Sequence, residues 1–357
     1  MGGFDANEAK KSGNLGPDNV NENTRDIPPP GQAAPPPFDL SKTAPSLKAS
    51  SPGALALMRR RFNGEEKPLP LPWPDLAEVL GGGLWPGMHV LLGETGTGKT
   101  ALALQIAHHA AGSGHPVLYV GLELDRAQIF ARLLSLELGS VEGRPAVHWS
   151  KLYLGKSDPD AREAAQATKR LDALPIHIEE GVPGSWSVLD TRATLDALRA
   201  EYPKASAAFK APLVVLDFLQ LVGPTLPGER EELRERIGKA AYYGRELARR
   251  FGAAVLLLSS VGRDKAKPIA EFSAAFAGKG DAPPDPSGLV GLGKESGDIE
   301  FAADTVLALA RDPRGKDLLG KGIMHLAVSK LRTGSPASCD LVFNGSWFEP
   351  RPVEVTA

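Results

Sequence analysis

Residues Gly93–Thr100 read Gly-Glu-Thr-Gly-Thr-Gly-Lys-Thr and fit the pattern G-x-x-x-x-G-K-[ST] without a gap. The glycines let the backbone curl, so that its N–H groups can face a concavity that holds phosphate oxygens. The run Met88–Leu92 before the loop predicts a buried strand, and Ala101–Ala111 after it predicts a helix whose positive end adds to the site. This stretch therefore predicts a phosphate loop that binds ATP or a related nucleoside triphosphate.

The positions of a phosphate loop have separate tasks. Lys99 should reach the β and γ phosphates, and the hydroxyl of Thr100 should bind Mg²⁺. The expected nucleotide-binding residues of the loop are Gly93, Glu94, Thr95, Gly96, Thr97, Gly98, Lys99 and Thr100. ATP and Mg²⁺ are accordingly the expected cofactors.

Two carboxylates follow predicted strands. Asp217 ends the apolar run Leu213–Leu216, which puts it at the carboxyl edge of a parallel sheet, where ligands bind. There it could hold Mg²⁺ together with Thr100, although it could instead cap a helix. Glu123 follows the predicted strand Val117–Val120 and could orient and deprotonate an attacking water, although it could also be a surface acid.

Strand and helix patterns alternate from about residue 68 onward. Further strands are expected over Ala253–Leu258 and Thr305–Ala310, and further helices over Arg126–Leu138 and Arg230–Phe251. This alternation predicts an α/β fold, a mostly parallel sheet with helices on both faces. Near the C-terminus, His325–Ser329 and Cys339–Phe343 flank Gly334-Ser335-Pro336 and predict a β-hairpin.

The composition excludes several classes of protein. The single cysteine, Cys339, excludes a disulfide framework and disfavours a cysteine zinc site. No apolar run approaches the length of a membrane span, and the N-terminus has no signal-peptide pattern, so we expect a cytoplasmic protein without membrane contacts. The net charge of −2 indicates no global basic field, so any nucleic-acid binding would depend on local cations.

The chain divides by composition into three parts. Residues 1–67 are rich in Pro, Gly, Asn and Ser and predict a disordered tail, with a short linker helix over residues 54–62. Residues 68–352 form the expected ATPase domain, and 353–357 a C-terminal tail. Residues 262–297 are rich in Gly, Ala and Pro, a composition that predicts a long functional or disordered loop.

Several motifs occur in the order found in one family. Leu84-Trp85-Pro86-Gly87 leads into the phosphate loop, Leu122-Glu123-Leu124 is followed by Gln128 and Arg132-Leu133-Leu134, and Leu216–Leu221 reads LDFLQL. Glu295–Glu300 reads ESGDIE and precedes Ala303-Asp304, Lys330–Gly334 reads KLRTG, and Phe343-Asn344-Gly345 closes the hairpin. From about Pro70 to Pro350 the chain resembles the C-terminal ATPase domain of DnaB-type replicative helicases, which is RecA-like.

This resemblance implies a ring of identical subunits, expected to be a hexamer, with ATP between neighbours. It implies that Lys330 and Arg332 reach the γ-phosphate bound by the next subunit, and it places Gln220 among the nucleotide-binding residues. Together with Glu123 and Lys99, these two cations complete the expected catalytic set. Cations on a bare hairpin could also be merely exposed.

The resemblance also implies single-stranded DNA in a central pore and contacts with a replication loader or primase. The candidate DNA-contacting cations are Arg230, Arg234, Arg236, Arg263, Lys265, Lys267 and Lys279. No aromatic platform for stacking on DNA bases is evident apart from Phe272 and Phe276. The sequence departs from the family at Ser260, where the family carries glutamine, and residues 1–67 contain no counterpart of the family's helical N-terminal domain.

Three functions remain open from the sequence. The leading hypothesis is a ring-forming ATP-dependent DNA helicase or translocase in DNA replication, which hydrolyses ATP at subunit interfaces. The second is a RecA-like regulatory or recombination-mediator ATPase that binds DNA or a protein without unwinding. A small-molecule kinase is the third, and it has no evident use for Lys330 and Arg332 on a C-terminal hairpin.

Overall fold

The computed structural model describes residues 45–139, 147–157, 159–187, 190, 196, 200, 210–224, 230–261, 266–277, 285–290, 292, 297–312 and 322–350. The chain divides into two compact units, Met1–Met58 and Arg59–Ala357. The described part of the first unit lies mostly in helix α2 (Leu47–Phe62), which begins seven residues before the expected helix 54–62. Residues 1–44 of the expected tail 1–67 lie outside the described residues, as does the expected C-terminal tail 353–357.

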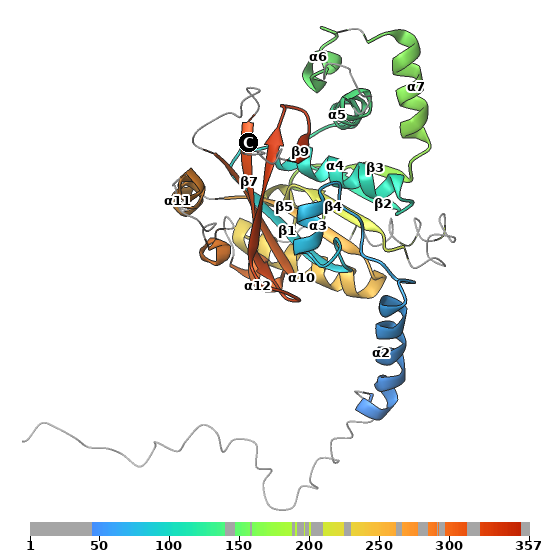
Figure 1. Ribbon diagram of the computed structural model, residues 1–357, viewed down its shortest axis with the longest axis vertical. Helices are drawn as coiled ribbons and strands as arrows, with labels where there is room; N and C mark the ends of the chain where they lie inside the picture. Colours follow the sequence, from blue (N-terminus) through green and yellow to red (C-terminus); the bar gives the residue numbers. More distant parts are fainter. Residues whose placement is uncertain are drawn as a thin grey trace, which may run out of the picture. The chain divides into compact units, whose positions relative to one another are not determined.

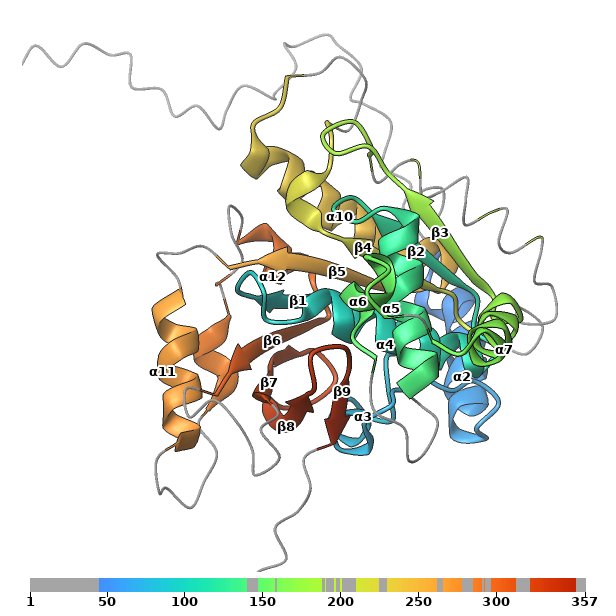
Figure 2. The same cartoon turned by 90° about the horizontal axis from the view of Figure 1, so that it is seen from above.

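A nine-stranded sheet forms the centre of the second unit, in the order β3-β2-β4-β5-β1-β6-β7-β8-β9 (Figures 1 and 2). The parallel strands are β1 (Gly87–Gly93), β2 (Val117–Gly121), β3 (Ile176–Glu180), β4 (Leu213–Asp217), β5 (Ala254–Ser260) and β6 (Thr305–Arg311). The antiparallel strands are β7 (Gly322–Leu331), β8 (Ala337–Phe343) and β9 (Phe348–Pro350). The predicted α/β fold, with a mostly parallel sheet and a C-terminal hairpin, is confirmed.

Helices cover both faces of this sheet because the strands are apolar on both sides. One face packs against α3 (Pro74–Val79), α4 (Lys99–Gly112) and α5 (Arg126–Gly139). The other packs against α10 (Leu233–Phe251), α11 (Ala266–Ala277) and α12 (Asp298–Ala302). Helices α6 (Trp149–Tyr153) and α7 (Ala161–Asp172) lie beside α5 at one side of the sheet (Figure 1). Every residue of β1 is buried, so the strand that carries the phosphate loop is fixed from both faces.

The described parts of the segment 262–297 include helical structure, although the composition of the segment predicts a long loop. It contains α11 and the 3₁₀ helix Pro286–Leu289, and Ile269 of α11 is buried in the core. Phe272 is only 6% exposed, so its proposed availability for stacking on DNA bases is wrong: its ring fills the core instead. The side chain of Phe276 lies outside the described residues.

Register places the functional segments at two edges of the sheet. Gly93, at the end of β1, is level with Ser260 of β5 and Leu309 of β6. Strand β6 then continues two residues farther, to Arg311, alongside the phosphate loop. At the other end of β1, the backbone N–H of Met88 lies against Asp304, which directly precedes β6. We call the side of the sheet formed by the carboxyl ends of the parallel strands the phosphate-loop edge, and the side formed by their amino ends the opposite edge.

Candidate active site

The phosphate loop joins β1 to α4 through two glycines with positive φ. Gly96 has φ 79° and Gly98 has φ 96°, a region that side chains with a Cβ rarely adopt. A Cβ on Gly98 would also lie 3.0 Å from the Phe348 ring. Gly98 is the N-cap of α4, so the N-terminal N–H groups of that helix face the loop. The local sequence thus builds a glycine-containing turn at the start of a helix, as the motif predicts.

Lys99 extends back across its own loop. Its Nζ atom donates hydrogen bonds of 2.9 Å to the carbonyl oxygens of Gly93 and Glu94. Burial lowers the pKa of Lys99, and the nearby carboxylates of Asp217, Glu123 and Glu94 oppose that shift. The ammonium group therefore lies within the field of the two carboxylates predicted for the site.

Asp217 lies at the phosphate-loop edge and is almost completely buried. Its carboxylate accepts a 2.7 Å hydrogen bond from the hydroxyl of Tyr119 and another from the hydroxyl of Thr100. Burial raises the pKa of Asp217 despite these two bonds, and repulsion from Glu123 adds to the increase. The structure thus brings together the two residues expected to bind Mg²⁺.

The donor set fits a magnesium ion. A hydroxyl and one carboxylate are hard oxygen ligands, and Mg²⁺ commonly binds through one or two protein groups together with phosphate oxygens and water. The described residues contain no cluster of three or more His, Cys, Asp or Glu side chains suited to a metal held by protein alone. A nearby cation would also favour the charged form of the buried Asp217 carboxylate.

Glu123 lies two residues beyond β2, in a turn that positions it above the sheet edge. The peptide N–H of Leu122 donates to the carbonyl oxygen of Asp217 at 2.7 Å, which ties this turn to the end of β4. The Glu123 side chain is exposed, and its charge acts on Lys99 and Asp217. Glu123 therefore lies close enough to Lys99 and Asp217 for its charge to act on both.

Gln220, predicted to bind nucleotide, makes its hydrogen bonds with β5. Its Nε2 donates to the hydroxyl of Ser259 at 2.8 Å, and its Oε1 accepts from the backbone N–H of Ser260 at 3.2 Å. Ser260 is the register partner of Gly93, so the amide lies one strand away from the first loop residue. Gln220 thus joins the ends of β4 and β5 beside the loop.

Two arginines at this edge were given no role from sequence. Arg132 stacks on the Trp149 ring, 3.7 Å from its centroid, and its charge interacts with Asp217 and Glu123. Arg311 donates through Nη2 to the carbonyl oxygen of Gly96 at 3.3 Å. In the sequence, Arg132 occurs only as part of a family motif. No sequence pattern indicated Arg311, because its position beside the phosphate loop depends on β6 extending past the end of β1.

A buried polar network follows Arg311 in the fold. Asp312 bonds Nε2 of His325 at 3.1 Å, and Nδ1 of His325 bonds Asp340 at 2.7 Å. Asp312 and His325 are both almost fully buried. The network joins the residue after β6 to β7 and β8, and so fixes the backbone that carries Arg311.

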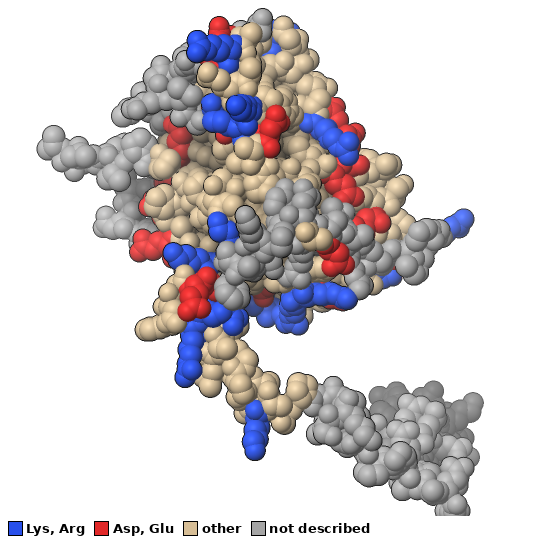
Figure 3. All heavy atoms as spheres, turned by 90° about the vertical axis from the view of Figure 1, so that its right-hand side faces the viewer, with Lys and Arg blue, Asp and Glu red and all other residues tan. Residues whose placement is uncertain are grey.

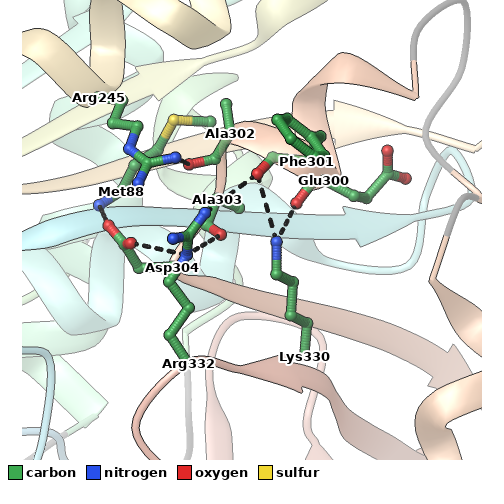
Figure 4. A network of polar contacts seen from close by, with 9 residues as sticks. All are labelled: Met88, Arg245, Glu300, Phe301, Ala302, Ala303, Asp304, Lys330 and Arg332. Atoms are coloured by element: carbon green, nitrogen blue, oxygen red, sulfur yellow. Dashed lines mark hydrogen bonds and ion pairs between the residues drawn. The ribbon is translucent and has the colours of Figure 1, made fainter.

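Lys330 and Arg332, which we call the finger pair, lie at the opposite edge of the sheet (Figure 4). Lys330 is paired in register with Val306, and Arg332 bonds the backbone of Asp304, next to the start of β1. The phosphate loop begins at the other end of β1, about 20 Å away at ~3.3 Å per residue. The structure therefore does not bring the finger pair to the phosphate loop of the same chain.

The family of this chain follows from a match that covers most of it. Residues 70–349 match the family described as the DnaB-like helicase C-terminal domain. The chain belongs to this family. The match spans the phosphate loop, both carboxylates and the finger pair, in agreement with the motifs found in the sequence.

Known proteins are similar to this chain over parts of their length. The replicative DNA helicase DnaB of Rhodothermus marinus is 27% identical over 244 residues, which is 68% of this chain and 22% of that protein. The DNA repair protein RadA of Mycobacterium tuberculosis is 45% identical over 67 residues, 18% of this chain and 14% of that protein. The chain thus spans less than a quarter of the length of each.

Two solved structures share the fold. One is an ATPase domain that superposes with a TM-score of 0.66 at 19% identity, covering 87% of this chain and 100% of that one. A DnaB-like replicative helicase, solved in a study of its interactions with primase, also gives 0.66, at 17% identity, covering 87% of this chain and 68% of that one. These likenesses show that the chain shares the fold of these two structures.

The candidate DNA contacts of the DnaB-like domain are only partly described. Arg230 and Arg236 line a pocket of about 380 Å³ with Pro224, Glu231 and Glu232, and Lys267 forms an ion pair with Glu271. Arg263, Lys265 and Lys279 lie outside the described residues. On the face drawn in Figure 3, basic and acidic side chains of the described residues are interspersed. No helix in the described part of the chain is long and apolar enough to cross a membrane.

Proposed function

We propose that this DnaB-like domain is the motor of a ring-forming DNA helicase or translocase that acts in DNA replication and hydrolyses ATP at subunit interfaces. The observation that carries the proposal is the separation of two half-sites. The phosphate loop, Thr100 and Asp217 lie at one edge of the sheet, and the finger pair lies at the other. The finger pair does not reach the phosphate loop of its own chain. In the proposed assembly, a second copy of the chain therefore supplies these two cations to the phosphate loop.

Each residue has a defined task in the proposed reaction. The loop N–H groups and Lys99 bind the triphosphate, and Glu123 orients the attacking water and accepts its proton. Arg332, with Lys330, stabilises the negative charge that spreads over the γ-phosphate oxygens in the transition state of the neighbouring subunit. Arginine suits this role because it stays charged and can donate two parallel hydrogen bonds.

Thr100 and Asp217 would hold Mg²⁺, which supplies charge neutralisation between the phosphates. Tyr119 keeps the Asp217 carboxylate oriented through its 2.7 Å hydrogen bond. Gln220, between the ends of β4 and β5, lies where a change at the γ-phosphate could be passed to β5. The expected partners are further copies of the chain, in a hexamer, single-stranded DNA in the pore, and a replication loader or primase in the cytoplasm.

One set of measurements tests the proposal. ATP hydrolysis, displacement of a strand from a forked DNA and assembly size should be measured with and without single-stranded DNA. A ring with DNA-stimulated hydrolysis and strand displacement is the expected result. Hydrolysis that ignores DNA would exclude the motor.

A second function, a RecA-like regulatory or recombination-mediator ATPase, has two observations in its favour. The RadA relatives share a higher identity with this chain than the DnaB relative does, although over a short stretch. Ser260 also stands where the family carries glutamine, which shortens the side chain at the end of β5. DNA-stimulated hydrolysis without strand displacement would favour this alternative.

A further inference from the structure

The finger pair is held by the carbonyl end of a short helix. Nζ of Lys330 donates to the carbonyl oxygen of Glu300 at 2.6 Å and to that of Phe301 at 3.4 Å. Arg332 donates to the carbonyl oxygens of Phe301 and Ala303, both at 3.3 Å. These carbonyls belong to the last turn of α12 and the residue after it, where the negative end of the helix favours cations. One element therefore holds both cations.

Arg245 completes this arrangement from the other side. Its Nη1 donates from α10 to the carbonyl oxygen of Ala302 at 3.3 Å, so the four consecutive carbonyls from Glu300 to Ala303 all accept bonds from cations (Figure 4). Burial and the neighbouring charge of Arg332 lower the pKa of Lys330. The three cations are thus close enough to interact, and the carbonyl end of α12 keeps them together.

Asp304 fixes the arginine in a way that the carbonyls cannot. Its Oδ1 lies 3.1 Å from Nε of Arg332, and its Oδ2 accepts a 2.9 Å hydrogen bond from the backbone N–H of Met88. The backbone N–H of Arg332 also donates to the carbonyl oxygen of Asp304 at 3.0 Å. The carboxylate therefore connects the guanidinium to the start of β1, a strand that is buried along its whole length.

Gly87 makes room for this connection. A Cβ at Gly87 would lie 2.9 Å from Oδ2 of Asp304, so any side chain there would displace the carboxylate. The arrangement occupies the Nε and Nη2 groups of Arg332, while its side chain remains 41% exposed. The remaining amino group, Nη1, has no hydrogen-bond partner among the described residues, and is the group available to a neighbour.

We infer that Asp304 is a positioning residue for Arg332: it orients the guanidinium so that it reaches the nucleotide of the next subunit. This inference rests on the proposed function, because it assumes that Arg332 acts across an interface. A positioning residue should affect the turnover rate and leave nucleotide affinity unchanged, since it does not touch the phosphate loop of its own chain. Variants of Asp304 and of Arg332 should also regain activity on mixing with the same partner variants.

The test compares Asp304→Asn and Gly87→Ala with Arg332→Ala, using Asp298→Asn on the exposed first turn of α12 as the matched control. Asp304→Asn and Gly87→Ala should lower kcat about 10- to 100-fold, the typical cost of a misplacement of about 1 Å. The dissociation constant of a fluorescent ADP analogue and the assembly size should stay at the wild-type values. Asp298→Asn should resemble the wild type throughout.

Mixing of variants decides between positioning and local damage. Asp304→Asn mixed with Lys99→Ala should regain activity, because the second variant supplies an intact finger pair and the first an intact phosphate loop. Mixed with Arg332→Ala it should regain none. Wild-type kcat in both Asp304→Asn and Gly87→Ala, or rescue by Arg332→Ala instead of Lys99→Ala, would overturn the inference.

The reference arm of the same experiment separates this inference from the proposed function. If Arg332→Ala and Lys99→Ala restore each other but Asp304→Asn behaves as wild type, only the positioning role fails. If Arg332→Ala keeps wild-type hydrolysis by itself, shared active sites fail as well. Thermal unfolding of each variant shows whether a loss of activity follows from loss of folded protein; should Asp304→Asn unfold, Gly87→Ala carries the test.

Discussion

The two edges of the sheet treat their carboxylates in opposite ways. Asp217, at the phosphate-loop edge, is buried with two hydroxyl donors and, in the described part of the chain, no ion pair, so its pKa is raised. Asp304, at the opposite edge, is half-buried and paired with Arg332. The first carboxylate is left in need of a cation from solution, whereas the second uses a cation of its own chain. A buried carboxylate that makes no ion pair among the described residues suits a metal ion, whereas an edge that presents a partly exposed arginine suits an anionic partner.

The largest expected effect comes from the opposite edge. Arg332→Ala should lower the hydrolysis rate by about 10³-fold or more, because an arginine supplied across an interface is worth that much in related phosphoryl transfers. Nucleotide binding should be preserved, as Arg332 is remote from the phosphate loop of its own chain. Steady-state hydrolysis and binding of a fluorescent ATP analogue measure the two quantities. Arg250→Ala, at the exposed end of α10, is the matched control, and a loss of nucleotide binding by Arg332→Ala would contradict its assigned role.

The next effect comes from the phosphate-loop edge. Glu123→Gln should lower kcat by about 10²- to 10⁴-fold, the range for removal of a general base, and leave nucleotide affinity nearly unchanged. Mixing with Arg332→Ala should restore activity, because that variant has an intact phosphate-loop edge and Glu123→Gln has an intact finger pair. Mixing with Lys99→Ala should not, because Glu123→Gln and Lys99→Ala are both defective at the phosphate-loop edge. Restoration of activity by Lys99→Ala would contradict the placement of Glu123 and Lys99 in the same half of the shared active site. Glu180→Gln, an exposed acid at the end of β3, serves as the control.

Stability should respond with opposite signs to the same substitution at the two edges. Because burial raises the pKa of Asp217, folding favours its protonated form, and stability is lost as the pH rises from the ordinary value through the folded-state pKa. Asp217→Asn should therefore stabilise the metal-free domain at neutral pH by about 1 kcal/mol, while removing hydrolysis. Asp304→Asn should destabilise it by up to about 1 kcal/mol, because Arg332 loses a partly exposed partner.

Chemical denaturation in the absence of Mg²⁺ measures both changes. The gain for Asp217→Asn should shrink as the pH falls from above the folded-state pKa toward and below the ordinary value of 3.8, where the wild-type carboxyl becomes protonated in both states. Equal signs for the two variants at neutral pH would remove the contrast between the edges. Addition of Mg²⁺ and nucleotide should stabilise the wild type and leave Asp217→Asn with less benefit.

The smallest effect concerns the tyrosine hydroxyl that bonds the carboxylate proposed to hold Mg²⁺. Tyr119→Phe removes a hydrogen bond that lowers the pKa of Asp217, so this pKa should rise further. The acid limb of the pH–rate profile should then move to higher pH, with less than about a 10-fold loss of rate at neutral pH, which corresponds to the ~1 kcal/mol of one hydrogen bond. Tyr153→Phe, which changes an exposed side chain of α6, should leave the profile in place. A shift toward lower pH would contradict the assigned donor.

Sequence patterns predicted the helices and strands that are uniformly apolar or that are clearly bounded by turn residues. The runs at Met88 and Leu213 became β1 and β4, because strands buried on both faces read as continuous apolar segments. Strand β3 was missed, since Ile176–Glu180 contains His177, Glu179 and Glu180 and lies at the partly exposed edge of the sheet. Strand β9 was missed because three residues carry too little periodicity.

The sequence predicted those site residues whose positions are set by a local motif. Lys99, Thr100 and Asp217 are fixed by the loop and by a strand end, and the structure brings them together as expected. The roles of Arg311 and Asp304 depend on tertiary register, which a local pattern does not encode. One is set by the length of β6 relative to β1, and the other by the missing Cβ of Gly87.

The roughly 20 Å that separates the finger pair from the phosphate loop has a consequence for mixed populations of subunits. If sites are shared as proposed, a subunit defective at one edge disables one site, whereas a subunit defective at both edges disables two. Activity should therefore fall linearly with the fraction of single-edge variant, and as the square of the intact fraction for a double variant such as Lys99→Ala with Arg332→Ala. The curvature of a simple titration would thus report how many neighbours each subunit serves.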